Sequence, residues 1–404
     1  MSDRSFLAWP FFADHHRRLA DDIGEWAERV LAPALAAEHD DVEAAAIRYA
    51  AQLGEAGFLR YVVPKAYGGA HEALDVRSLC LIRETLARYS GIADVAFAMQ
   101  GLGSGSISLA GSDLVKLRYL PKVATGKHIA AFAMTEPSGG SDVAAVQTTA
   151  REDGDAYVLD GAKTFISNAG IAHHYVVFAR TAPTGAKGLT AFVVDADTKG
   201  LSVTEKLDLL APHPIGTLEF KGCRVPKAQM LGRPGEGFKV GMATLDIFRT
   251  TVGAAALGFA RRALDEGLDY ADHRQAFGQN LSEFQLVQDK LAQMALDVDT
   301  SALLIYRSAW VKDAGAARVT REASMAKFHA TEAAQRVVDA ALQIHGGRGV
   351  VTGQAVERLY REVRALRIYE GASDIQKLVI ANQILKDHRD AAGQAPAGAQ
   401  AKKP

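Results

Sequence analysis

One carboxylate near the C-terminus, that of Glu370, has a sequence context that suits a general base. Glu370 lies between the ring of Tyr369 and Gly371, and the pair Ser373 and Gln376 has the S-x-x-Q pattern of a capping box that opens a helix. The apolar residues that follow continue at helical spacing: Ile375, Leu378 and Val379. An acid on a loop before a positive helix end, in an apolar cleft, is a candidate general base. The alternative is an acid that only favours the helix end or pairs with Arg367.

Two stretches in the middle of the chain combine what a flat cofactor requires. Residues 131–142 run from an apolar strand into a Pro-Gly-Gly turn with hydroxyl side chains, which exposes backbone N–H groups. Residues 163–168 place Phe165 near Ser167, an aromatic face beside a hydroxyl. A ring cofactor needs an apolar face and donors for its polar edge. The alternative is an ordinary turn and a half-buried strand.

The elements that position these residues are predicted from two changes of period. An N-terminal helical domain (1–127) precedes a middle β-barrel-like domain (128–235), in which 157–159, 175–178 and 189–194 read as strands. Asp153-Gly154 and Asp160-Gly161 read as turns between strands. A C-terminal four-helix bundle (236–390) follows, and a disordered tail (391–404) ends the chain. The bundle has an apolar seam: Phe284, Val287, Leu291, Met294 and Val298. The predicted class is α+β.

Composition narrows the function classes. The chain has 404 residues, 48% of them hydrophobic, and a net charge of −1, which argues against nucleic acid as a partner. No apolar run is long enough to span a bilayer, so no membrane insertion is expected. The start lacks a signal-peptide pattern, and Cys80 and Cys223 read as buried thiols rather than a disulfide framework. A reducing, cytoplasmic location is expected.

The order and spacing of several motifs resemble the acyl-CoA dehydrogenase family over roughly residues 28–385. These motifs are Ala133-Met-Thr-Glu-Pro137 with Gly140-Ser141-Asp142, Arg274-x-x-Phe277-Gly278 with Gln285, Gln343-Ile-His-Gly-Gly347, and Tyr369-Glu-Gly371. The resemblance implies FAD as cofactor, an acyl-CoA substrate and electron transfer to an electron-transfer flavoprotein. It also implies a homotetramer, built as a dimer of dimers, or a dimer.

The resemblance further implies the cofactor site, residue by residue. Expected beside the flavin ring and the thioester are Met134, Thr135, Gly140, Ser141, Phe165, Ile166 and Ser167, with the Ser167 hydroxyl near the reactive flavin nitrogen. Many relatives have Trp in place of Phe165. Expected to bind FAD held mainly by a neighbouring subunit are Arg274, Phe277, Gln285, Gln343, Gly346 and Gly347. A planar guanidinium suits the diphosphate. Expected to close over the cofactor are Gly371, Ser373 and Asp374.

The implied substrate site centres on Glu370 as the catalytic base. Its expected members are Ser141, Asp246, Arg249, Tyr369, Glu370 and Gly371. In some relatives the base lies instead directly before the arginine of the 246–249 stretch, but here that position is Phe248. The expected reaction removes the α-proton and transfers the β-hydrogen as hydride to the flavin, giving a trans-2-enoyl-CoA. The acyl group stays open, although Phe97 to Gly101 are expected at the pocket floor.

The sequence leaves two rival functions open. An acyl-CoA oxidase would use the same residues with oxygen as the electron acceptor. A flavoprotein-like binding or regulatory module would not dehydrogenate, and Glu370 argues against it because such members tend to lack the base. Measurement of oxygen consumption distinguishes an acyl-CoA oxidase from a dehydrogenase.

Several other features are expected to carry no chemistry. Residues 101–105 contain half of a dinucleotide fingerprint but lack the surrounding strand, so helix packing is expected there. His173 and His174 read as surface strand residues without metal-ligand spacing, and no metal is expected. His213 reads as a solvated loop histidine, with a place behind the cofactor site or at an interface as the alternative. The arginine groups Arg261-Arg262 and Arg358, Arg361, Arg364 read as solvated faces or subunit contacts.

Overall fold

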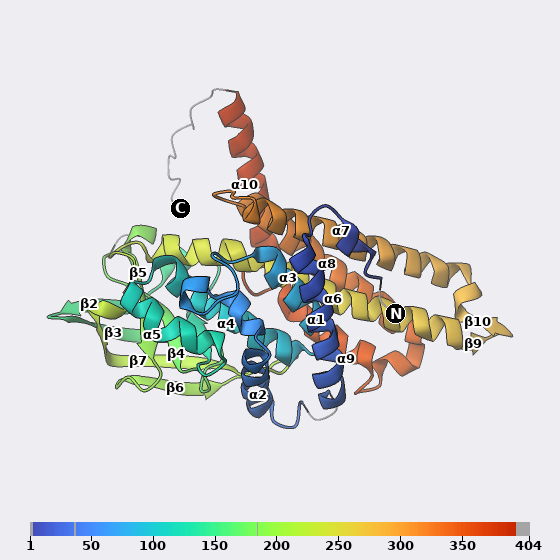
Figure 1. Ribbon diagram of the computed structural model, residues 1–404, viewed down its shortest axis with the longest axis horizontal. Coiled ribbons are helices and arrows are strands. Elements are labelled where there is room, and N and C mark those ends of the chain that lie inside the picture. Colours follow the sequence, from blue (N-terminus) through green and yellow to red (C-terminus); the bar gives the residue numbers. More distant parts are fainter. Residues whose placement is uncertain (1–2, 36–37, 184, 393–404) are drawn as a thin grey trace.

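The chain builds a sheet domain at one end of an elongated molecule and long helices along the rest of it. A computed structural model describes residues 3–35, 38–183 and 185–392. Figure 1 shows the strands of the main sheet, β2 to β7 among them, at one end of the long axis, the α6, α7 and α8 helices running away from them, and the small β9–β10 hairpin at the other end. Helix α10 rises from the body near the C-terminus (Figure 1). The predicted α+β class, with a helical, a β and a second helical part in that order, is confirmed.

The N-terminal part is a set of short and medium helices. They are η1 (Ser5–Ala8), α1 (Asp14–Val30), η2 (Ala32–Ala34), α2 (Val42–Glu55), η3 (Phe58–Val62), η4 (Lys65–Tyr67), α3 (Val76–Tyr89), α4 (Gly91–Ala110) and α5 (Asp113–Ala124). Four of them begin at side chains that accept a backbone N–H of the first turn: Asp41, Asp75, Ser90 and Ser112. Cys80 on α3 is a buried free thiol, as expected.

The middle part is one twisted sheet. Its strands are β1 (Ala130–Ala133), β2 (Thr149–Asp153), β3 (Ala156–Ser167), β4 (His174–Arg180), β5 (Leu189–Asp195), β6 (Leu201–Lys206), β7 (Ile215–Pro226) and β8 (Met230–Leu231). Their order is β6-β7-β3-β2-β4-β5-β8, with β1 parallel to β4. The Asp153-Gly154 turn joins β2 to β3. The second predicted turn is wrong: Asp160-Gly161 lies inside β3, where the pairing with β7 shifts register.

The C-terminal part is dominated by three long helices. Its elements are α6 (Gly237–His273), β9 (Gln275–Ala276), β10 (Gln279–Asn280), α7 (Gln285–Asp313), α8 (Thr320–His345), η9 (Gly346–Val350), α9 (Ala355–Leu366) and α10 (Ser373–Ala391). Helix α6 lies at the centre of this part and packs on α3, α7, α8 and α9. A Cβ added at Gly258 would lie 2.1 Å from the Glu84 carbonyl oxygen, so this crossing with α3 requires glycine. Within the described chain, no helix is both long and apolar enough to cross a bilayer.

The start of α10 differs from the expectation. The N-cap position is Ala372, which has no side chain to accept a hydrogen bond, so the predicted S-x-x-Q capping box does not form. The Ser373 hydroxyl instead donates to Glu332 on α8 at 2.6 Å. The Gln376 amide donates to the Gly371 carbonyl at 3.3 Å and thereby holds the preceding turn. Helix α10 reaches Ala391, and residues 393–404 of the predicted tail lie outside the described residues.

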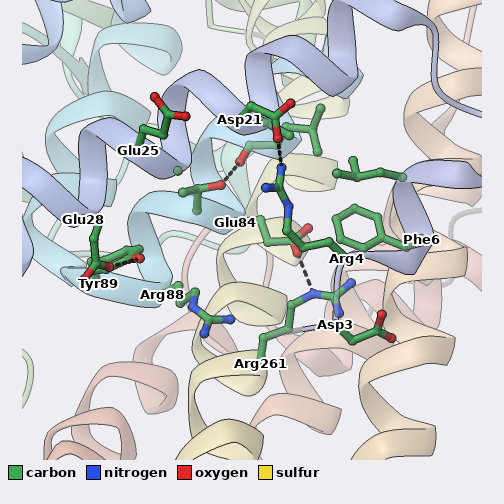
Figure 2. A pocket seen from close by; sticks show the side chains of 15 residues that line it. Asp3, Arg4, Phe6, Asp21, Glu25, Glu28, Glu84, Arg88, Tyr89 and Arg261 are labelled. Atoms are coloured by element: carbon green, nitrogen blue, oxygen red, sulfur yellow. Dashed lines mark hydrogen bonds and ion pairs between the residues drawn. The ribbon is translucent and has the colours of Figure 1, made fainter. Parts of the chain in front are cut away.

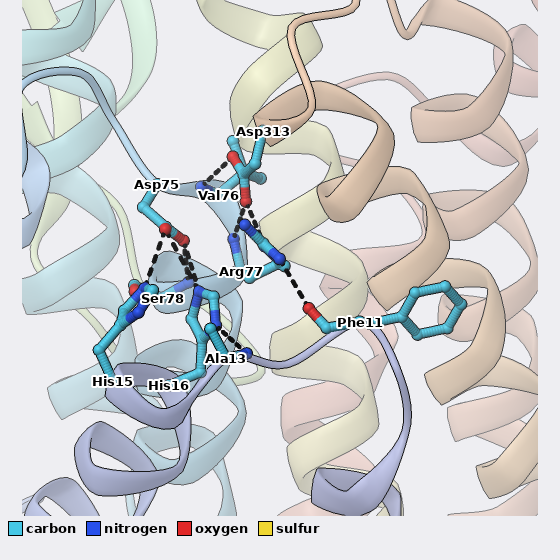
Figure 3. Close-up of polar contacts among 9 residues, drawn as sticks. All are labelled: Phe11, Ala13, His15, His16, Asp75, Val76, Arg77, Ser78 and Asp313. Carbon is cyan, nitrogen blue, oxygen red and sulfur yellow. Dashed lines mark hydrogen bonds and ion pairs between the residues drawn. The ribbon is translucent and has the colours of Figure 1, made fainter.

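A histidine–aspartate cluster ties α1 to α3 (Figure 3). The Nε2 atoms of His16 and His15 lie 3.1 and 3.4 Å from the Asp75 carboxylate. Because His16 Nδ1 accepts the Ala13 N–H at 3.0 Å, its Nε2 carries the proton and donates to Asp75. A metal bound at Nε2 would need that proton on Nδ1. The arrangement therefore suits fastening of two helices and not coordination of an ion.

Candidate active site

Glu370 lies on the strained turn between α9 and α10. Its φ is +51°, in the left-handed region that non-glycine residues seldom adopt, and Gly371 follows at +101°. Three donors hold the two carbonyls of this turn. Arg249 Nε donates to the Glu370 carbonyl at 3.2 Å, and Lys327 Nζ and Gln376 donate to the Gly371 carbonyl at 2.8 and 3.3 Å. The turn thereby fixes where the Glu370 carboxyl points.

The carboxyl group of Glu370 has one oxygen without a hydrogen bond to the described residues. Its Oε2 atom is buried and has no hydrogen-bond partner in the described part of the protein. Arg367, the alternative partner considered from sequence, pairs with Glu332 on α8 at 2.8 Å. A buried polar atom without a partner is costly, so its presence on a strained turn calls for a functional explanation.

Charges around Glu370 come from four other elements, α3, α4, α6 and α8. Burial raises the pKa of Glu370, while Arg83, Lys327 and Arg249 act in the opposite direction and Asp94 adds to the rise. Arg83 and Asp94 form a buried bidentate pair, with N–O distances of 2.8 and 2.7 Å between α3 and α4. The net effect is a carboxyl poised to exchange a proton nearer to neutral pH than an ordinary glutamate.

Sequence reasoning did not find Arg83, Asp94 and Lys327. Each is a charged residue within an apolar stretch of a helix, and Lys327 is fully buried. Burial lowers the pKa of Lys327 to about 8, with Glu370 as the largest opposing influence. The signal available in the sequence was a lysine or arginine at a core position of the helical period, which is rare unless the charge is paired.

The 246–249 stretch lies in the first half of α6, and its side chains contact three different elements. Arg249 is buried and bonded to the Glu370 turn, and Asp246 accepts from it at 3.3 Å and from Thr320 at 2.8 Å. Phe248, at the alternative base position, fills space against α4: a Cβ at Gly101 would lie 2.5 Å from its ring. Residues 101–105 thus serve helix packing, as predicted, and no nucleotide loop forms there.

The end of β1 and the turn after it are held by a buried ion pair. Lys163 Nζ lies 2.8 Å from Glu136 Oε1 and 3.1 Å from the Met134 carbonyl. Glu136 also accepts the N–H groups of Gln147 and Thr148, at 2.6 and 2.9 Å. The predicted flavin-side residues Thr135, Gly140 and Ser141 lie on this turn and are partly or fully exposed.

The end of β3 lies beside that turn and exposes its aromatic ring. Thr164 N–H donates to the Thr135 carbonyl at 3.0 Å, which brings the two predicted cofactor segments together. A register shift between Lys163 and Ile166 turns Phe165 outward, with φ +55° and 60% of the residue exposed, while Ile166 is buried. An exposed aromatic face flanked by hydroxyls and a glycine turn fits the ring system of FAD.

Helix α6 connects this face with Glu370. A Cβ at Gly241 would lie 2.5 Å from Met134 Cε, so Met134 reaches the helix at this glycine. Arg249, which holds the Glu370 turn, is eight residues further along the same helix, a rise of about 12 Å. The flavin-side residues and the candidate base are therefore held about two turns apart along one rigid element.

The remaining cofactor residues lie elsewhere. Phe277 forms the tip of the β9–β10 hairpin with φ +50° and is 97% exposed. The hairpin lies at the opposite end of the long axis from the main sheet (Figure 1). Arg274 and Gln285 flank this hairpin and are exposed. Gln343, Gly346 and Gly347 end α8 and are also exposed, and His345 beside them stacks on Tyr270 of α6 at 4.1 Å. These residues do not meet Phe165 within one chain.

Three expectations for polar residues are wrong. His174 is fully buried and not a surface residue, although His173 beside it is exposed. His213 is partly buried and bonded to Ser167 at 3.1 Å, and burial lowers its pKa to about 4. Arg261 is buried and pairs with Glu84 at 2.6 Å. In each case a neighbouring strand or helix, distant in sequence, covers a side chain that the local pattern left open.

A pocket at the N-terminal segment is separate from this site (Figure 2). It has a volume of about 350 Å³. Arg4–Asp21 and Arg261–Glu84 ion pairs lie on its wall, which Phe6 and Tyr89 complete. None of the predicted site residues lines it, so we assign it no part in the site.

Comparison with known proteins adds the family. Three family models match in sequence order: the acyl-CoA dehydrogenase N-terminal domain over 13–127, the middle domain over 131–223 and the C-terminal domain over 235–385. A 3-(aryl)acrylate reductase of Clostridium sporogenes is 39% identical over 380 residues, covering 93% of this chain and all of that protein. The human mitochondrial short-chain specific acyl-CoA dehydrogenase is 40% identical over 378 residues, 93% of this chain and 91% of its own.

A solved structure links the fold to the cofactor. The structure of an acyl-CoA dehydrogenase from Bacillus anthracis complexed with FAD superposes with a TM-score of 0.88 at 30% identity, covering 97% of this chain and 72% of the other. Together with the three matched domains and the exposed ring and hydroxyl face of the β domain, this agreement assigns the protein. The chain belongs to the acyl-CoA dehydrogenase family and is an FAD-dependent oxidoreductase.

Proposed function

We propose that the protein oxidises the Cα–Cβ bond of an acyl-CoA thioester to a trans-2-enoyl-CoA, with Glu370 as the base. The observation that carries this assignment is the buried, unpartnered Glu370 Oε2 on a turn fixed by Arg249 and Lys327. Phe248 occupies the other position known for the base in this family. The family relationship supports the reaction class, and the site geometry supports this residue.

In this proposal each group of the chain has a defined task. Glu370 Oε2 accepts the α-proton, while Arg249 and Lys327 keep its turn in place. Phe165 and Ile166 provide the apolar support for the flavin, and Thr135, Ser141 and Ser167 provide hydroxyls at its edge. FAD, when bound, supplies the acceptor for the β-hydride. Tyr369 and the Gly371 turn lie against the acyl group, and Asp246 with Arg249 line the approach from α6.

The cofactor site is proposed to be shared between copies of the chain. Arg274, Phe277, Gln285, Gln343, Gly346 and Gly347 are exposed, and the β9–β10 hairpin lies at the end of the molecule away from the main sheet (Figure 1), so in this proposal they contact the FAD of a neighbouring copy. Ser373 and Asp374, at the start of α10, cover the cofactor of their own chain. A homotetramer built as a dimer of dimers is the proposed assembly.

The electron partner is proposed to be an electron-transfer flavoprotein. An oxidase would instead pass electrons to oxygen, and oxygen consumption by the reduced protein distinguishes the two. The Clostridium relative is named a 3-(aryl)acrylate reductase, which makes the reverse reaction a second candidate. Incubating reduced protein with enoyl-CoA and aryl-acrylyl-CoA substrates tests that direction, because reoxidation of the flavin reports it.

Glu370→Gln tests the central assignment. The amide keeps the shape of the side chain but cannot accept the proton, so flavin bleaching by a good acyl-CoA should slow by at least about 10²–10⁴-fold. Anaerobic stopped-flow absorbance measures it. FAD content and acyl-CoA binding should be retained. Glu357→Gln, which removes a carboxylate paired with Arg361 on α9, serves as the control. Bleaching near the parent rate in Glu370→Gln would place the base elsewhere.

A further inference from the structure

His213 is held directly behind the hydroxyl of Ser167. The two residues come from opposite sides of the β3–β7 pairing, with Ser167 at the last position of β3 and His213 two residues before β7. His213 Nε2 lies 3.1 Å from Ser167 Oγ. Ser167 and Ile215 are paired across the two strands, so the contact is part of the sheet's register and not of a free loop.

The loop that carries His213 has little freedom. Prolines stand on both sides of it, at 212 and 214, and each ring fixes its own φ and restricts the residue before it. The Pro214 carbonyl accepts the Asn168 N–H at 2.8 Å. The Asn168 side chain in turn donates to the Ala130 carbonyl at 3.0 Å. Ser167 and His213 are thus fastened to each other by the residues next to both.

The direction of the Ser167 hydroxyl follows from the state of the ring. Burial lowers the pKa of His213 to about 4, so the imidazole is neutral and has one donor and one acceptor nitrogen. A backbone hydrogen bond to Ala211 raises that pKa, which is the effect of a carbonyl accepting from the ring. This contact favours the tautomer with the proton on Nδ1, in which Nε2 is the acceptor and the Ser167 hydroxyl donates to it.

We propose that His213 is a positioning residue that directs the Ser167 hydroxyl away from the cofactor face, so that Ser167 presents lone pairs to bound FAD and favours its reduced form. The inference rests on the proposed placement of Ser167 at the flavin edge. Reduction adds a proton to a ring nitrogen of the flavin, which turns an acceptor into a donor. A hydroxyl oxygen with free lone pairs accepts from that donor, whereas a hydroxyl free to turn would donate to the oxidised ring.

The midpoint potential of the bound FAD tests this inference. His213→Ala frees the hydroxyl, and the affinity for oxidised relative to reduced FAD should rise about two- to tenfold, the range of one ordinary hydrogen bond. A tenfold change lowers the potential of a two-electron couple by about 30 mV. His213→Gln, whose amide oxygen also accepts, should restore much of the parent value. Leu210→Ala, on the same loop and exposed, should leave the potential unchanged.

A double-variant comparison shows whether His213 acts through Ser167. In a Ser167→Ala background, His213→Ala should produce no further shift of the potential. A shift of equal size in both backgrounds, or none in His213→Ala while Ser167→Ala changes the potential, would overturn the role of His213 alone. An unchanged potential in Ser167→Ala would overturn the placement of Ser167 at the flavin, and this inference with it. Bleaching kinetics of Glu370→Gln report separately on the proposed reaction.

Discussion

Strained backbone marks the candidate site residue by residue. Among the described residues, four that are not glycine have φ in the left-handed region: Phe165, Asn168, Phe277 and Glu370. Three of them were predicted at the site from sequence, and the fourth holds the loop of His213. Such conformations cost about 1–3 kcal/mol each and persist only where the surroundings impose them. At Glu370 those surroundings are Arg249, Lys327 and Gln376, each bonded to a carbonyl of the turn.

The charge state of Glu370 gives a prediction about pH. Burial raises its pKa, and because the deprotonated carboxylate is the proposed base, flavin reduction should increase as pH rises through that raised value. Lys327 opposes the rise, so Lys327→Met should move the ascending limb to higher pH. Lys377→Met, an exposed lysine on α10, is the matched control. Stopped-flow measurement of flavin bleaching between about pH 5 and 9 gives the ascending limb for the parent and for each variant.

The charge of Lys327 is itself pH-dependent. Since burial lowers its pKa to about 8, the parent protein loses this support above that pH, whereas the Lys327→Met profile has no such change. Coinciding profiles for Lys327→Met and the parent would mean that Lys327 serves only the Gly371 carbonyl. In that case its contribution is structural, and the field at Glu370 comes from Arg83 and Arg249.

At the scale of elements, the cofactor face depends on how β1 and β3 are fastened. The buried Lys163–Glu136 pair joins the end of β3 to the turn after β1, and Glu136 also orders residues 147–148 through two N–H groups. Burial raises the pKa of Glu136, but Lys163 and the hydrogen bonds outweigh it, so the carboxylate stays ionised. The register shift that exposes Phe165 begins at Lys163. One ion pair therefore sets the shape of both flavin-side segments.

Removing the Lys163 charge should strongly destabilise the folded protein. Lys163→Met leaves a buried carboxylate without its cation and should lower the free energy of unfolding by about 3–5 kcal/mol. The pair of changes Lys163→Met and Glu136→Gln should recover part of this, because Gln carries no charge and its single amide oxygen still accepts one of the two N–H groups. Thermal unfolding followed by circular dichroism compares them, with exposed Lys221→Met as control. A double variant no more stable than Lys163→Met would contradict the charge argument.

The sequence predicted most of the elements but not their polar contacts. Helical and strand periods predicted the helical, β and second helical parts, and the motifs singled out Glu370, Phe165 and Ser167 as candidate site residues. The capping box at Ser373 failed because Glu332 on α8, 41 residues away, binds that hydroxyl. The Asp160-Gly161 turn failed because a register shift inside β3 uses the same residue types as a turn. Contacts between distant segments, such as Arg83–Asp94 with Glu370, have no local signature.

At the scale of the whole molecule, the proposed cofactor residues are divided between its two ends. The sheet carries Phe165 and Ser167, while the β9–β10 hairpin carries Phe277 at the far end of the long axis (Figure 1). Helices α7 and α10 expose apolar side chains along their lengths: Leu286, Leu296, Leu303, Trp310, Leu378, Ile384 and Leu385. A row of exposed apolar residues on long helices is typical of a surface covered by another chain.

A shared site predicts complementation between two defective chains. Arg274→Ala removes the proposed diphosphate contact and should weaken FAD binding about ten- to 100-fold, the range for hydrogen bonds to charged groups. Phe165→Asp places a charge on the flavin face and should also lose FAD. In a two-fold pair formed from one chain of each kind, both defects fall on one of the two shared sites, and the other site is intact.

Differently tagged chains, co-expressed and purified through both tags, isolate such hybrids. Their flavin absorbance per chain should recover to about half of the parent value, because one site in two is whole, while each variant alone stays nearly colourless. Arg364→Ala, an exposed arginine on α9, should bind FAD like the parent and controls for loss of a surface charge. If the sites were built within single chains, every site of the hybrid would carry a defect. Hybrids as colourless as the single variants would therefore place Arg274 and Phe165 in the same chain's site and remove the argument for a shared cofactor.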